Sequence, residues 1–239
     1  MKTPLLILHG AIGASHQLKA IAEKLSAYYE VHLFDFPGHG GKALSDEPFS
    51  IKLFADAVLV YVQKNNLSKL TIFGYSMGGY VALYLARHHQ QLIDKIVTLG
   101  TKFHWDEATA AREVRMLDAA AIEVKVPAFA AALAETHAPN DWKEVLRRTA
   151  DMLLEMGKDN PLTPDDHKEI KTASLILLGD RDKMVSVEET IAVYRNLPNA
   201  QLGILPGTSH PVEKVDAELV VYFISKCNGF SQFGTGGRP

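Results

Sequence analysis

Residues 71–86 read TIFGYSMGGYVALYLA, and the character of this stretch changes at its middle. The first residues are β-branched or aromatic, which is typical of a buried strand, and the residues after Ser76 favour a helix. Gly74 and Gly78 flank the serine in a Gly-x-Ser-x-Gly pattern. A serine held between a strand and a helix requires a turn so tight that only glycine fits beside it. Such a turn lifts the hydroxyl clear of the sheet and aims the next N–H, that of Met77, at whatever the hydroxyl attacks.

Five further apolar runs, each ending in a turn signal, accompany this stretch. They are continuous rather than alternating, as expected for strands that are buried on both faces of a parallel sheet. The runs are LLILHG, VHLFDFPG, KIVTLG, SLILLGDRD and AQLGILPG, and stretches with helical periodicity cover residues 16–29, 51–65, 77–90, 187–196 and 214–226. The alternation predicts an α/β fold with a doubly wound, mostly parallel sheet of about six strands.

One connection is much longer than a crossover between parallel strands needs. It is rich in alanine, methionine and charged residues, it predicts three or four helices, and it is broken at Pro127, Pro139 and Pro161. We therefore expect residues 1–226 to form a single domain, with residues 104–168 inserted as a helical cap over one end of the sheet. Residues 227–239 are rich in glycine and predict a flexible C-terminal tail.

Composition limits the partners that the chain can have. Of its 239 residues 47% are hydrophobic and 22% charged, and the formal net charge of -3 gives no basic surface for nucleic acid or anionic lipid. The single cysteine, Cys227, leaves no internal disulfide and indicates a cytoplasmic protein. No export signal, membrane span, phosphate loop or metal-ligand motif is found. We expect a small-molecule substrate, no nucleic-acid or membrane partner and no cofactor; the oligomeric state is not predicted.

A serine hydroxyl needs a base to become a nucleophile, and the chain has ten histidines to supply it. His210 lies just after the last predicted strand, so its loop emerges at the same edge of a parallel sheet as the serine turn. The carboxylate that orients this histidine is expected from another such loop, where Asp180 and Asp182 are both available. The resulting chain order is Ser, Asp, His.

Two backbone donors are expected to bind the oxyanion that forms when a serine attacks a carbonyl. The N–H of Met77 is the first, because it directly follows the serine. The second is expected from a loop after a neighbouring strand, and the turn that follows His9 offers the N–H of Ala11. We expect His9 itself to support this loop rather than to take part in catalysis.

Together these segments resemble the α/β-hydrolase fold family, in its branch of small, cofactor-independent serine hydrolases with a helical cap. LHGAIG, DFPGHG, GYSMGG, GDRDKMV and GTSHPVE follow the family order over nearly the whole chain. The resemblance implies Ser76 as nucleophile, His210 as base, Asp182 as the triad acid, and Met77 and Ala11 as oxyanion donors. The one or two antiparallel strands that usually open this fold are missing.

The resemblance implies hydrolysis of carboxylic esters or thioesters through a Ser-His-Asp triad and an acyl-enzyme. Two alternatives stay open. One is a lyase that uses the triad to abstract a proton, as menaquinone-pathway and hydroxynitrile lyases do, and the other is a ligand-sensing regulatory protein on the same fold. Serine rather than aspartate at residue 76 argues against the related dehalogenases and epoxide hydrolases. The alanine-rich stretch VPAFAAALA in the insertion is typical of ordinary helix packing and would also suit an apolar pocket wall, and the substrate is not predicted.

Overall fold

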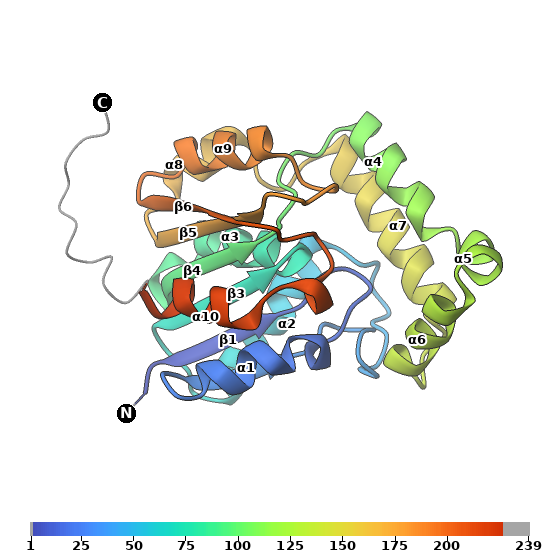
Figure 1. The fold of residues 1–239 in the computed structure, drawn as a ribbon, viewed down its shortest axis with the longest axis horizontal. Coiled ribbons are helices and arrows are strands. Elements are labelled where there is room, and N and C mark those ends of the chain that lie inside the picture. The colour runs from blue at the N-terminus through green and yellow to red at the C-terminus, as the bar shows by residue number, and fades with distance from the viewer. Residues whose placement is uncertain (1, 227–239) are drawn as a thin grey trace.

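The computed structural model describes residues 2–226 and contains a six-stranded sheet in which all neighbouring strands are parallel. The strand order is β2-β1-β3-β4-β5-β6 (Figure 1). The strands are β1 (Pro4–Leu8), β2 (Glu30–Phe34), β3 (Leu70–Tyr75), β4 (Ile93–Leu99), β5 (Ala173–Gly179) and β6 (Ala200–Leu205). Each overlaps one of the six apolar runs, so the predicted fold class is confirmed. The predicted tail, residues 227–239, lies outside the described residues.

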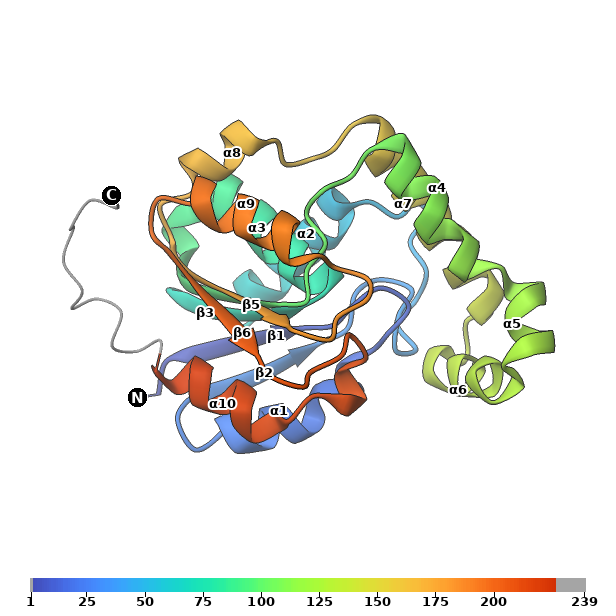
Figure 2. The same ribbon diagram turned by 45° about the horizontal axis from the view of Figure 1, so that its top comes forward.

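Helices cover both faces of the sheet (Figures 1 and 2). One face carries α1 (Lys19–Leu25) and α10 (Ala217–Lys226), and the other carries α2 (Ile51–Lys64), α3 (Met77–His89) and α9 (Val187–Asn196). In β1, Leu5 and Ile7 belong to the hydrophobic core beneath α1 and α10. Leu6 and Leu8 belong to the core on the opposite face, beneath α2, α3 and α9. Because successive side chains of a strand point to opposite faces, a continuous apolar run supplies both cores at once.

Two predicted helices are longer than the observed ones. The stretch 16–29 is divided between a 3₁₀ helix, Ser15–Leu18, and the short α1. The stretch 214–226 becomes a helix only at Ala217, because the Asp216 carboxylate accepts the N–H of Glu218 at 2.8 Å and so caps the first turn. Helical periodicity therefore located these helices but did not define their first residues.

The long connection between β4 and β5 folds largely beyond the carboxyl ends of the strands (Figures 1 and 2). Its helices are α4 (Glu107–Glu113), α5 (Ala119–Lys125), α6 (Pro127–His137), α7 (Trp142–Lys158) and α8 (Pro164–Glu169). The prediction of three or four helices was too low, since Asp118 caps α5 and Pro127 starts α6 as separate short helices. We call α4–α7 the cap. Helix α8 is not part of it, because α8 packs against α9 and is joined to α3 by an ion pair between Arg87 and Asp166 at 2.9 Å. None of the helices between residues 2 and 226 has the length and apolarity that a membrane span requires.

Candidate functional site

The turn that carries Ser76 joins β3 directly to α3. Ser76 has a φ of 51° and a ψ of -119°, a left-handed conformation that costs free energy for any residue with a side chain. A Cβ atom added to Gly74 would lie 2.4 Å from the Gly79 nitrogen, and one added to Gly78 would lie 2.4 Å from the Leu8 oxygen. These distances are far below van der Waals contact, so the predicted need for glycine on both sides of the serine is confirmed.

Neighbouring strands hold this strained turn in place. The Ser76 N–H donates to the Leu99 oxygen of β4 at 2.9 Å, and the Ser76 carbonyl accepts from the Thr101 hydroxyl at 3.0 Å. The side chain is half-buried and lines a cavity of about 460 Å³ between the strand ends and the cap. Ala11, Met77 and His210 line the same cavity, so four of the five predicted site residues share it.

Asp182 and His210 come from the loops after β5 and β6 and meet through a hydrogen bond of 2.7 Å between Oδ2 and Nδ1. The other carboxylate oxygen accepts the N–H groups of Met184 at 2.8 Å and Val185 at 2.9 Å. Asp180, the alternative acid, instead accepts the N–H of Thr208 at 3.2 Å. The carboxylate of Asp182 therefore fixes the His210 ring, and the carboxylate of Asp180 fixes the loop that precedes it.

Asp182 is held as a charged carboxylate. Its side chain is only 1% exposed, and this burial by itself would raise its pKa. The hydrogen bond and charge of His210, with the two backbone N–H groups, outweigh burial and keep the Asp182 pKa below its ordinary value. A carboxylate on Nδ1 favours the tautomer with its proton on that nitrogen, in which Nε2 of His210 carries the free lone pair.

The loop after β1 brings Ala11 against the serine. Gly10 and Gly13 close a turn through a backbone hydrogen bond of 3.2 Å, and a Cβ on Gly10 would lie 3.2 Å from the Cβ of Ser76. Within residues 2–226 the Ala11 N–H donates no hydrogen bond. The Met77 N–H opens α3, where the first N–H groups have no acceptor inside the helix and the helix dipole favours negative charge. Both predicted donors therefore have spare hydrogen-bonding capacity beside Ser76.

His9 supports this loop from below, as expected from the sequence. Its ring is fully buried, its Nδ1–H donates to the Gly10 oxygen at 2.7 Å, and its Nε2 accepts the Phe36 N–H at 3.2 Å. Burial lowers the pKa of His9 to about 4, so the ring stays neutral and keeps both hydrogen bonds at neutral pH.

Comparison with known proteins identifies the family to which the chain belongs. A sequence model of the alpha/beta hydrolase fold matches residues 3–149, which is more than half of the chain. The chain belongs to the α/β-hydrolase family.

Two curated proteins are similar to part of this chain. The pimeloyl-[acyl-carrier protein] methyl ester esterase of Neisseria meningitidis is 34% identical over 107 residues, which cover 45% of this chain and 39% of that protein. The 2-succinyl-6-hydroxy-2,4-cyclohexadiene-1-carboxylate synthase of an Enterobacter species is 36% identical over 109 residues, 44% of this chain and 40% of that protein. The hydrolase thus spans well under half the length of these two curated relatives.

The solved structure of an enol-lactonase from Burkholderia xenovorans superposes on the hydrolase with a TM-score of 0.77. It covers 96% of this chain and 92% of the lactonase at 16% identity, so the likeness concerns the fold alone.

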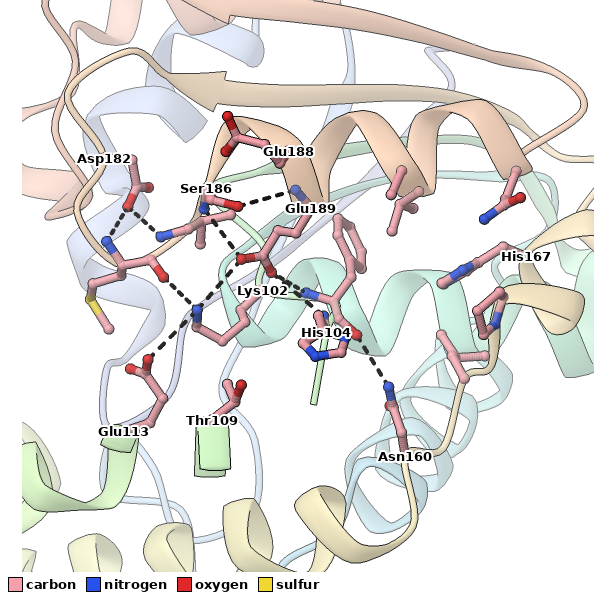
Figure 3. A pocket seen from close by; sticks show the side chains of 18 of the residues that line it. Lys102, His104, Thr109, Glu113, Asn160, His167, Asp182, Ser186, Glu188 and Glu189 are labelled. Atoms are coloured by element: carbon pink, nitrogen blue, oxygen red, sulfur yellow. Dashed lines mark hydrogen bonds and ion pairs between the residues drawn. The ribbon is translucent and has the colours of Figure 1, made fainter. Parts of the chain in front are cut away.

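The hydrolase also has a buried ion network that the sequence did not predict (Figure 3). The Lys102 ammonium lies 3.6 Å from Glu113 of the cap and 3.6 Å from Glu189 of α9, and it donates to the Met184 oxygen in the loop after Asp182. Its side chain is 9% exposed and lines both the Ser76 cavity and a second cavity of about 730 Å³. Lys102 therefore joins the cap, α9 and the loop of the predicted acid, and no local pattern in the sequence signals contacts between such distant segments.

Four buried histidines make the stability of the hydrolase sensitive to acid. The His39 ring lies 5.3 Å from that of His9 and 5.6 Å from that of His137, with Asp35 nearby, and His167 is buried separately. Burial lowers the pKa of all four, to about 4 for His9 and His167. The unfolded chain therefore binds protons near pH 6.5 that the folded chain binds only at lower pH.

We expect the unfolding free energy to fall as the pH drops from about 6.5 towards 4, because the unfolded state then binds more protons. Each such histidine contributes a slope of about 1.4 kcal/mol per pH unit. Calorimetric Tm values measured across this range check the prediction, with His167→Gln as the comparison that removes one titrating group and flattens the slope. A Tm that does not change between pH 6.5 and 4 would contradict it.

Proposed function

We propose that this protein is a serine hydrolase that cleaves carboxylic esters or thioesters of small molecules through Ser76, His210 and Asp182. One observation carries the proposal: the strained, half-buried Ser76 lines the same cavity as His210, and Nδ1 of His210 is bound to the buried carboxylate of Asp182 at 2.7 Å. This arrangement suits removal of a proton from the serine hydroxyl better than it suits any structural role, because the strain at Ser76 gains nothing for packing.

In the proposed mechanism, Nε2 of His210 takes the Ser76 proton as the oxygen attacks the carbonyl carbon. The N–H groups of Met77 and Ala11 bind the oxyanion, and the imidazolium, stabilised by the charge of Asp182, protonates the leaving alcohol or thiol. Water then attacks the acyl-enzyme with His210 again as base, which releases the acid and restores the serine.

The wall of the cavity favours an uncharged, apolar acyl chain. Five of the six methionines of the chain line it, with Trp105 and Phe129 among the remaining apolar residues; these methionines are Met77, Met116, Met152, Met156 and Met184. Unbranched, polarizable methionine side chains adapt to ligands of different shape. We propose that the cap, which supplies three of these five methionines, encloses the acyl chain.

The charges on the cavity wall favour an esterase over a lyase whose substrate carries several carboxylates. The name of the synthase relative describes a compound of that kind. Glu113 and Glu213 line the cavity, and its one lysine or arginine, Lys102, is shared by Glu113 and Glu189. A substrate with several carboxylates would meet repulsion there without a free cation to offset it.

A panel of p-nitrophenyl esters from acetate to octanoate tests the proposal. We expect kcat/KM to rise by about fourfold for each added methylene until the cavity is filled, because each buried methylene contributes about 0.8 kcal/mol. Met156→Trp should lower kcat/KM for the long esters and leave acetate nearly unchanged. Labelling of Ser76 by a fluorophosphonate without turnover of any ester or thioester would reject hydrolysis and favour a ligand-sensing protein.

A further inference from the structure

The turn beside Ser76 contains a residue that does not suit its own conformation. Ile12 has a φ of 53° in the turn closed by the hydrogen bond between Gly10 and Gly13. The third position of such a turn normally holds glycine or asparagine, because a side chain is strained at positive φ. For a β-branched residue the conformation is a true outlier, and it persists only where the surroundings impose it.

The cap supplies these surroundings. The Ile12 carbonyl accepts a hydrogen bond of 3.0 Å from Nε2 of His137, at the end of α6. The Ile12 side chain packs against an apolar cluster that lies wholly within the insertion, formed by Ile122, Ala130, Leu133, Trp142 and Leu146. The carbonyl and the side chain of this strained residue are therefore both held by the cap rather than by the sheet.

The cap segment that holds Ile12 is itself firmly seated on the core. Nδ1 of His137 accepts the Gly40 N–H at 3.4 Å, which places the ring proton on Nε2, where it faces Ile12. Asn140 donates to the Gly38 oxygen at 3.2 Å and to the Lys42 oxygen at 2.6 Å. The His137 ring is 1% exposed, so no water competes for these bonds.

We propose that His137 is a positioning residue: from the cap it holds the strained turn at Ile12, and thereby keeps the Ala11 N–H aimed at the site where the oxyanion forms. The oxyanion hole is then complete only when the cap is packed against the core. A chain with the cap lifted would keep Ser76 and His210 but would lose one oxyanion donor, because Ile12 would relax to a negative φ. This inference rests on the proposed acyl-transfer function.

Steady-state kinetics of His137→Ala and His137→Gln with a p-nitrophenyl ester test the proposal. Complete loss of an oxyanion donor lowers kcat by about 10²–10³-fold, so we expect His137→Ala to lower kcat by about 10–100-fold with KM changed less than threefold. Glutamine can still donate to the Ile12 oxygen, so His137→Gln should recover most of this loss. A His137→Ala kcat within twofold of wild type, or no rescue by glutamine, would overturn the proposal.

His167→Ala is the matched control, because His167 is equally buried in the insertion but has no contact with the turn. It should lower Tm without the loss of kcat. If His137→Ala does not fold, Ile12→Pro replaces it, since proline fixes φ near -65° and forces the turn out of its conformation. A wild-type kcat in Ile12→Pro would then overturn the proposal. Absence of ester turnover in the wild type would instead reject the proposed function, so the two failures are distinguishable.

Discussion

Replacement of Ser76 by alanine is expected to lower kcat for activated esters by about 10⁴-fold or more, with little change in KM. The reason is that no other hydroxyl can occupy its place: the turn is set by Gly74 and Gly78, and the Ser76 backbone is fixed to β4 at 2.9 Å. The cavity keeps its shape without the hydroxyl, so binding of substrate should survive while the chemical step is lost. Turnover of p-nitrophenyl butyrate and intact-protein mass after fluorophosphonate treatment measure both consequences.

Ser209→Ala serves as the control for this variant, since Ser209 directly precedes His210 but does not line the cavity. It should keep turnover within about threefold of wild type, because the Ser209 hydroxyl makes no hydrogen bond within the described residues and the His210 ring keeps its bond to Asp182. Ester turnover that persists in pure Ser76→Ala protein would remove Ser76 from the reaction and with it the proposed function.

Replacement of Asp182 by asparagine is the second large effect, with an expected loss of about 10⁴-fold in kcat near neutral pH. An amide facing Nδ1 at 2.7 Å favours the wrong tautomer of His210, with the proton on the nitrogen that should act as base. The amide also removes the charge that stabilises the imidazolium during attack. Kinetics at pH 7 to 8, with Tm recorded for each variant, separate this loss from destabilisation.

Asp180→Asn is the matched comparison, because it makes the same change two residues earlier in the same loop. Asp180 accepts the backbone N–H of Thr208, and an amide oxygen can still accept this bond. Its other oxygen lies 3.6 Å from Nε of Arg181 in an exposed ion pair, which contributes little free energy. We expect a loss of less than about tenfold, since the His210 ring keeps its carboxylate. If Asp180→Asn were the more damaging change, the assignment of the acid would be reversed.

Much of the fold could be predicted because its signals are local. Continuous apolar runs mark strands that are covered on both faces, and the crowding at Gly74 and Gly78 follows from the tightness of one turn. The edge on which His210 and the two aspartates emerge also follows from a parallel sheet. The choice between Asp180 and Asp182 did not follow from the residues alone; it depends on the direction in which each carboxylate points, which is set by the loop after β5.

The parts that could not be predicted are contacts between distant segments. His137 meets Ile12, and Lys102 meets Glu113, only because the cap folds back over the strand ends. Ile12 is the clearest case, since its side chain by itself predicts an extended backbone and not a left-handed turn. Tertiary contacts override the local preference there, and such conflicts concentrate near functional sites.

The methionine-lined wall has a cost in an oxidising environment. Peroxide converts the methionine thioether to a polar sulfoxide, and Met116, 52% exposed at the cavity, is open to it, whereas Met152 and Met156 are buried deeper. Oxidation would therefore proceed inward from the rim and turn a water-repelling lining into one that retains water. The adaptability of this lining and its vulnerability to oxidants have the same chemical origin, the soft sulfur atom.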